Sequence, residues 1–204
     1  MAYILGFFTA DGNMIRNKRG AHFIEFQITD RDLLIKIRKA LGSNHKITAR
    51  KRNERWKTSY RLQIGSKEIF CDLIKLGITP NKSKSIGLPQ VKSRYFSHFA
   101  RGYFDGDGNV WAGYRYRSNR KKPTTVLLTR FTSGSRKFIV EFRDRLTKEI
   151  GLSSNSSILF YSGGYRLSYS IKDSIKFYNF IYSGNSDLCL SRKKKIFEKF
   201  IKGR

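Results

Sequence analysis

The sequence contains two similar segments, one near the beginning of each half of the chain. Residues 4–13 read ILGFFTADGN, and residues 100–109 read ARGYFDGDGN. Each segment places a glycine within a run that is typical of a helix, and each ends on Asp-Gly-Asn. A chain with one such segment per half is expected to contain two copies of one module, with Asp11 and Asp107 in equivalent positions.

The residues after each segment repeat one order of helices and strands. In the first half, apolar periodicity and turn residues predict helices at 2–10, 30–41 and 66–77, and strands before residue 17 and at 22–28, 44–51 and 56–64. In the second half they predict helices at 93–105 and 135–150, and strands at 110–117, 125–132, 157–161 and 165–170. We therefore predict an α+β protein with modules at 1–77 and 93–204, a linker at 78–92, and a basic final helix.

The chain carries 42 Lys and Arg residues against 15 Asp and Glu residues, which gives a net charge of +27. Such an excess would repel itself in a compact fold unless a polyanion lies nearby, so nucleic acid is the expected partner. Neither a basic amphipathic helix nor an apolar span of about 20 residues stands out, so we expect no membrane partner. The isolated Cys71 and Cys189 favour a reduced intracellular compartment, which is either the cytoplasm or an organelle (mitochondrion or chloroplast).

Gly6 and Gly102 lie inside the two predicted segment helices. Glycine in a helix interior costs roughly 1 kcal/mol relative to alanine, so it suggests that another backbone must come close. If the helices pack together at these glycines, their C-terminal ends bring Asp11 and Asp107 side by side. The alternative is that Asp-Gly is only a helix stop, in which glycine supplies a left-handed C-cap and aspartate favours a turn.

Two adjacent carboxylates at helix C-termini are electrostatically unfavourable, because each faces a like charge and the negative end of a helix dipole. A divalent cation relieves both effects, and oxygen ligands without histidine or cysteine suit Mg²⁺ rather than Zn²⁺. On a very basic chain, this pair points to phosphodiester hydrolysis, in which metal ions polarise the phosphate and activate water.

The two segments resemble the LAGLIDADG motifs of homing endonucleases, in the single-chain form with two motifs. The resemblance implies two pseudo-symmetric αββαββα halves, with the motif helices at the central interface and antiparallel sheets forming a DNA-binding saddle. It implies a monomer that binds double-stranded DNA and cuts a long, asymmetric target to leave 3′ overhangs, as in intron homing. It also implies two or three divalent ions, with Mg²⁺ as the cofactor, Mn²⁺ as a possible replacement and Ca²⁺ as a substitute that does not support cleavage.

The same resemblance implies roles for individual residues. The metal ligands would be Asp11 and Asp107, supported by the carbonyl groups of Ala10 and Gly106. The first motif departs from the family pattern at Thr9, where the second has Asp105. In the family this position is usually not the metal ligand, so the difference removes no catalytic group.

The family also carries a basic residue near each active site. Residues 77–83, which read GITPNKS, look like the family's Lys-Ser segment and make Lys82 the first candidate. The counterpart would fall within residues 191–194, where we choose Lys193. These lysines would stabilise the transition state or orient water; a solvated helix face or a phosphate contact is the alternative. Gln27 and Thr132 end matching strands, where they would position water or contact DNA.

Alternation along the strands predicts which side chains point away from the helices. A face rich in Arg, Lys, Gln, Ser and Thr suits a β-ribbon in the major groove, with phosphate contact or simple solvation as the alternative for each residue. The predicted contacts are Gln27, Lys46, Thr48, Arg50, Arg55, Lys57, Ser59, Arg61 and Gln63, and in the second half Arg115, Arg117, Arg130, Thr132, Arg166 and Ser168. The two sets differ, so the target should not be a palindrome. We interpret Trp56 and Trp111 as packing or hairpin residues.

A second hypothesis is a binding protein that keeps this fold without the chemistry, such as an intron maturase or a DNA-binding regulator. Both Asp11 and Asp107 are present, which favours the enzyme, because a pure binder has no need of two facing acids. A nuclease embedded in an intein would require splicing segments, for which the sequence offers no support.

Overall fold

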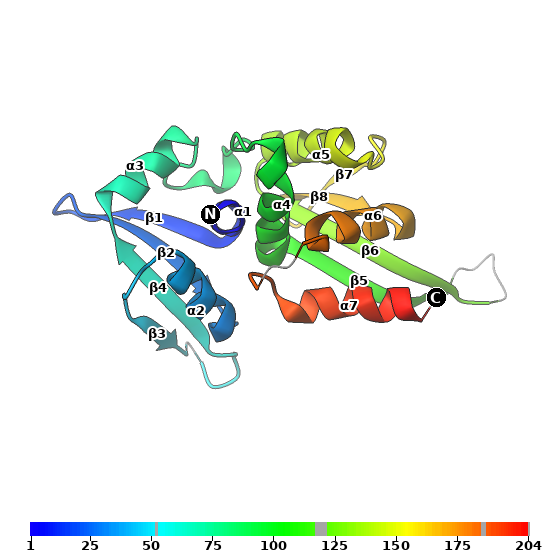
Figure 1. Ribbon diagram of the computed structural model, residues 1–204, viewed down its shortest axis with the longest axis horizontal. Coiled ribbons are helices and arrows are strands. Elements are labelled where there is room, and N and C mark those ends of the chain that lie inside the picture. The colour runs from blue at the N-terminus through cyan, green and yellow to red at the C-terminus, as the bar shows by residue number, and fades with distance from the viewer. Residues whose placement is uncertain (52, 117–121, 185–186, 204) are drawn as a thin grey trace.

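The computed structural model describes residues 1–51, 53–116, 122–184 and 187–203, and it contains two halves with the same order of elements (Figure 1). The first half consists of α1 (Ala2–Asp11), β1 (Gly12–Arg16), β2 (His22–Ile28), α2 (Arg31–Ala40), β3 (Ile47–Arg50), β4 (Ser59–Gly65) and α3 (Lys67–Lys75). The second consists of α4 (Ser93–Asp107), β5 (Gly108–Arg115), β6 (Thr124–Ser133), α5 (Arg136–Ile150), β7 (Ile158–Tyr161), β8 (Gly164–Tyr169) and α6 (Ile171–Tyr182). The predicted α+β fold of two αββαββα halves is confirmed.

Two further elements stand outside this repeat. A short 3₁₀ helix, η1 (Lys82–Lys84), lies between the halves, and the basic helix α7 (Ser191–Lys202) follows α6. Among the described residues, no helix combines the length and apolar character needed to cross a membrane.

Each half contains a four-stranded antiparallel sheet, with strand orders β1-β2-β4-β3 and β5-β6-β8-β7. The registers correspond: Phe26 of β2 is opposite Gly12, and Phe131 of β6 is opposite Gly108. In Figure 1 the sheets lie on either side of the central helices α1 and α4. The residues that follow each motif therefore lead directly into equivalent strands.

The helices begin where the capping residues predict. The side chains of Asp30, Ser66 and Ser135 accept backbone N–H groups three residues later, at 3.0, 3.2 and 3.3 Å. Each bond satisfies one of the free donors at a helix N-terminus. Gly151 adopts a left-handed conformation with φ +61° and ends α5.

The hairpin that connects β3 to β4 is longer than the sequence predicts. Asn53 closes a turn, because its side chain accepts the N–H of Arg55 at 3.2 Å and its carbonyl accepts the N–H of Trp56 at 3.1 Å. The two strands therefore cover only residues 47–50 and 59–65. The predicted strand residues Lys46 and Lys57 lie in loops instead, as does Arg55, which the sequence placed in the turn.

The glycine after each motif helix does not provide a left-handed cap. Gly12 and Gly108 have φ values of −75° and −84°, which any residue can adopt. A Cβ atom at either position would overlap the ring of Phe8 or Phe104. The helix-stop alternative is therefore wrong, because it required a left-handed glycine. The glycine instead makes room for an aromatic ring at the point where the helix leads into the strand.

The two motif helices pack backbone against backbone, as Gly6 and Gly102 predict. A Cβ atom on Gly6 would overlap the carbonyl of Phe99, and one on Gly102 would overlap the carbonyl of Tyr3. The missing side chains therefore allow α1 and α4 to approach closely along the pseudo-symmetry axis.

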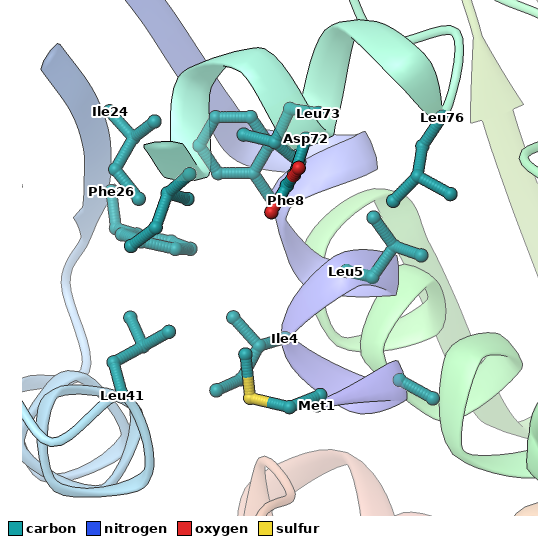
Figure 2. A pocket seen from close by; sticks show the side chains of 12 residues that line it. Met1, Ile4, Leu5, Phe8, Ile24, Phe26, Leu41, Asp72, Leu73 and Leu76 are labelled. Carbon is teal, nitrogen blue, oxygen red and sulfur yellow. The ribbon is translucent and has the colours of Figure 1, made fainter. Parts of the chain in front are cut away.

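The two halves differ in how the space beside the motif helix is filled. In the second half, the ring of Phe131 lies 5.1 Å from the rings of both Phe142 and Phe177, measured between centroids. The first half has an apolar cavity of about 240 Å³ between α1, β2 and α3. Figure 2 shows Ile4, Leu5 and Leu73 among the side chains around it.

Candidate active site at the ends of the motif helices

Asp11 and Asp107 are the last residues of α1 and α4. Because the helices cross at Gly6 and Gly102, both carboxylates reach the same end of the interface. A Cβ atom on Gly106 would lie 3.3 Å from the Oδ2 atom of Asp11 and would overlap the Cβ atom of Ala10. The small residues before each aspartate therefore allow the two acidic helix ends to meet.

Burial raises the pKa of both carboxyl groups above the usual range of an aspartate. Burial raises the pKa of Asp107 to about 7, with the charge of Asp11 as the next cause, while Lys82 and Lys193 oppose the shift. Burial also raises the pKa of Asp11, and the same two lysines oppose it. The surrounding protein partly desolvates both carboxyl groups, yet part of Asp11 reaches the surface and Asp107 is half-buried, so the pair remains open to solvent. A cation placed between them would favour the ionised form of both acids.

Lys82 and Lys193 lie in matching places beside this pair. Only 8% of Lys82 and 5% of Lys193 is exposed, which rules out a solvated helix face for either. The Nζ atom of Lys82 donates to the carbonyl of Gly12, and that of Lys193 donates to the carbonyl of Gly108 at 2.5 Å. The two candidates chosen from the sequence therefore take equivalent positions, each against the first residue of a strand.

The amine of Lys193 is surrounded by carbonyl groups from the end of α4. An ammonium group has three N–H bonds, so it cannot serve four acceptors at once. Burial lowers the pKa of Lys193 to about 8 and also lowers the pKa of Lys82. The acceptors of the Lys193 Nζ atom are the carbonyl oxygens of Phe104 at 2.6 Å, Asp105 at 2.8 Å, Gly106 at 3.5 Å and Gly108 at 2.5 Å.

The donor set at this site fits a hard divalent cation. In the part of the chain that the structure describes, no group of three or more His, Cys, Asp and Glu residues gathers around a common point. Asp11 and Asp107 would therefore supply two carboxylates, and the remaining oxygens would come from carbonyl groups, water or substrate. Mg²⁺ accepts such a shell, whereas Zn²⁺ favours nitrogen and sulfur ligands.

Asp105 has a different role from Asp107, and sequence reasoning missed it. Its Oδ2 atom accepts the hydroxyl of Tyr3 at 2.7 Å and the N–H of Leu190 at 2.9 Å. Burial raises the pKa of Asp105 to about 6. In the first half, the hydroxyl of Thr9 instead donates to the carbonyl of Leu5 in its own helix, at 2.8 Å. Asp105 therefore links the two halves and the start of α7.

The register places most of the predicted DNA contacts on the sheet faces that point away from the helices. On the first sheet, Arg61 forms an ion pair with Glu25 at 3.3 Å. Arg117 lies outside the described residues. The residues on these faces are Gln27, Thr48, Arg50, Ser59, Arg61 and Gln63 on the first sheet, and Arg115, Arg130, Thr132, Arg166 and Ser168 on the second.

Among the predicted DNA contacts on the two sheets, Gln27 and Thr132 lie nearest to the C-terminal ends of the motif helices. Each follows the residue that pairs with the glycine after a motif helix, Phe26 in one sheet and Phe131 in the other. The amide of Gln27 donates to the hydroxyl of Ser59 at 3.1 Å, and the side chain of Thr132 is exposed. Both side chains therefore lie on strands that adjoin the acidic pair.

Comparison with known proteins agrees with this architecture. Residues 1–77 match the family model of the LAGLIDADG-like domain. Comparison with curated protein sequences gives no match. Among solved structures, I-AabMI bound to uncleaved DNA has 13% sequence identity and a TM-score of 0.67, with coverage of 98% of this chain and 88% of the other.

Two further structures show the same likeness. I-LtrWI bound to target DNA has 12% identity and a TM-score of 0.60, over 100% of this chain and 90% of the other. I-SmaMI bound to uncleaved DNA in the presence of calcium ions has 15% identity and a TM-score of 0.65, over 98% and 89% of the two chains. The protein therefore contains a LAGLIDADG-like domain and has the two-domain fold of the single-chain LAGLIDADG meganucleases.

Proposed function

We propose that this protein is a site-specific DNA endonuclease that cuts both strands of a long, asymmetric target by metal-dependent hydrolysis, leaving 3′ overhangs. The observation that carries the proposal is the meeting of Asp11 and Asp107 at the C-terminal ends of α1 and α4, on a chain of net charge +27. The DNA-bound states of I-AabMI and I-LtrWI support duplex DNA as the substrate.

Asp11 and Asp107 would hold the metal, with the carbonyl groups of Ala10 and Gly106 as supporting ligands. A bound Mg²⁺ ion would polarise the phosphate and lower the pKa of a water molecule. We expect Mn²⁺ to replace it, and Ca²⁺ to allow binding without cleavage. The complex of I-SmaMI with uncleaved DNA in the presence of calcium ions supports the use of divalent ions.

Lys82 and Lys193 would act through their charge. Their amines already donate to backbone carbonyls, so each charge is held in place beside the acidic pair. A fixed positive charge stabilises the negative charge that develops on a phosphate during hydrolysis. We assign both lysines to this electrostatic role.

The proposal also covers the oligomeric state, the module boundaries and the location of the protein. The chain would act as a monomer, because each half supplies one of the two acids. We place the module boundaries at residues 77 and 93 and the protein in a reduced compartment of the cell. A role in intron homing would follow if the target is an allele that lacks the inserted gene.

The test begins with selection of a target from random-sequence duplex DNA in Ca²⁺, followed by cleavage of a plasmid that carries it. We expect double-strand cleavage in Mg²⁺, none in Ca²⁺, and a loss of about a thousandfold in rate for Asp11→Asn and for Asp107→Asn, since metal stabilisation is worth several kcal/mol. Asp144→Asn, on the exposed surface of α5, is the matched control and should cleave normally.

Two results would contradict the proposal. Specific binding without cleavage in Mg²⁺ or Mn²⁺ would instead identify a silent DNA-binding protein. Full cleavage of both strands by Asp107→Asn would exclude an active site shared by the two motif helices.

A further inference from the structure

Each sheet carries an apolar cross-strand pair on the face that points away from the helices. Ile15 of β1 is opposite Phe23 of β2, and Trp111 of β5 is opposite Leu128 of β6. Their neighbours along the strands face the core: Met14 and Ile24 in the first sheet, and Val110 and Leu127 in the second, are at most 5% exposed. Because side chains alternate along a strand, the four apolar residues must face outward.

The two pairs occupy equivalent positions. Ile15 comes four residues after Asp11, and Trp111 comes four residues after Asp107. With a rise of about 3.3 Å per residue, each pair begins roughly 13 Å along its strand from the acidic site. The pairs are thus placed at equal distances along their strands from the acidic pair at the ends of the motif helices.

Both faces leave space for the aromatic member of the pair. A Cβ atom on Gly65 would lie 3.4 Å from the Cε1 atom of Phe23, and one on Gly113 would come within 2.8 Å of the Cζ2 atom of Trp111. Trp111 remains 43% exposed and pairs across the β5–β6 hairpin, so of the two roles that the sequence suggested, packing or hairpin, it takes the second. Phe23 therefore leans toward the neighbouring strand β4 and Trp111 leans along its own strand β5, and each ring keeps part of its surface accessible.

The surroundings of these pairs are strongly polar. Arg61 and Gln63 flank the first pair's face, while Arg115, Arg130 and Arg166 lie on the second. A phosphate backbone would match these arginines but would gain nothing from an apolar side chain. In the major groove, the C5-methyl group of thymine is the apolar feature of the base edges.

We propose that the Ile15–Phe23 and Trp111–Leu128 pairs each contact the 5-methyl group of a thymine, at matching distances on either side of the cleavage site. This inference rests on the proposed binding of duplex DNA, and it adds a symmetric element to an otherwise asymmetric target. At about 3.4 Å per base pair, the two thymines lie roughly four base pairs from the centre.

The test replaces each thymine of the selected target, one at a time, with deoxyuridine, which lacks only the methyl group. Affinity is measured in Ca²⁺ by fluorescence anisotropy. We expect one thymine in each half-site, at matching distances from the centre, to show a loss of about fourfold, the value of one buried methyl group. Because the change is made in the DNA, folding of the protein is unaffected.

Protein variants then assign each thymine to its pair. Phe23→Ser should abolish the deoxyuridine effect in the first half-site alone, and Leu128→Ser should abolish it in the second alone, because serine has no methyl group to contact the thymine. Tyr114→Ser is the matched control, because Tyr114 is 70% exposed on β5 but faces the opposite side of the sheet. It should leave both effects unchanged.

A tightly bound target with no methyl-dependent thymine at matching positions would overturn this inference and leave the endonuclease proposal intact. Deoxyuridine effects that persist in both serine variants would likewise overturn it and would assign the pairs to sheet packing alone. Failure to select any bound duplex would contradict DNA binding itself, and with it both proposals.

Discussion

The two halves of the molecule are alike at the helix crossing and differ away from it. At the crossing, each half contributes a glycine, a terminal aspartate and a buried lysine in matching positions. Farther out, α4 has 15 residues where α1 has 10, and α6 has 12 where α3 has 9. Two copies of one fold thus keep the elements that place the acids and vary in the size of the surrounding core.

The shorter helix α3 also packs differently from its longer counterpart α6. Ser66 and Ser170 cap α3 and α6, so Leu73 and Phe177 occupy equivalent places, seven residues after each cap. Phe177 is fully buried, whereas Leu73 lines the cavity in Figure 2. The smaller helix of the first half leaves unfilled a space that an aromatic ring fills in the second.

Substitutions at the crossing of α1 and α4 should give the largest losses of stability, and the losses should be equal in the two halves. Gly6→Ala and Gly102→Ala each place a Cβ atom on the backbone of the opposite helix, which cannot rotate away. We expect each to lower the free energy of unfolding by roughly 3 kcal/mol, as strong overpacking does. Thermal and urea denaturation measure the change.

The control for this pair is Gly184→Ala. A Cβ atom there has open space, and the backbone is not left-handed, so stability should be unchanged. If Gly6→Ala were as harmless as this control, the close helix contact would be disproved.

The packing difference can be tested by exchanging the two equivalent residues. Phe177→Leu removes ring contacts with Phe104 and Phe131, at centroid distances of 5.5 and 5.1 Å, and should cost about 1–2 kcal/mol. Leu73→Phe fills part of the cavity and should gain about 1 kcal/mol. Differential scanning calorimetry of both variants gives opposite shifts in Tm if the comparison holds, and two losses if the cavity cannot accept a ring.

The smallest single effect should come from Thr9, which takes the place of Asp105 in the first motif and forms no bond to the other half. Tyr3→Phe removes the hydrogen bond to the buried Asp105 and should cost about 1–2 kcal/mol, because a buried acceptor loses a partner. Thr9→Val keeps the shape but loses only a bond within α1, so a change of about 0.5 kcal/mol is expected. Equal losses in chemical denaturation would mean that Asp105 does not link the two halves.

Much of this architecture could be predicted from local signals. Asp30, Ser66 and Ser135 mark helix starts because capping depends on residues three positions apart, and those three helices begin directly after them. Gly6 and Gly102 pointed to the helix contact because glycine is costly in a helix unless something needs the space. The equivalence of Asp11 and Asp107 followed from the repeat.

Other features depend on residues that are distant in sequence, and these could not be predicted locally. Tyr3 and Asp105 are joined only because the crossing brings them together. Lys193 came from a family resemblance, since nothing in its own run of basic residues distinguishes it. The short β3–β4 ladder reflects a turn at Asn53 that competes with strand pairing, and alternation alone does not reveal such competition.

The backbone contact between α1 and α4 has a consequence for how such a chain can diversify. The distance between the two acids depends on glycines and small residues at the crossing, and the outward strand residues take no part in it. Mutations can therefore accumulate on either sheet without altering where the backbone of a ligand would be cut. A half grafted from another chain would keep the geometry of the acids, provided that its motif helix has a glycine at the position where the two helices touch.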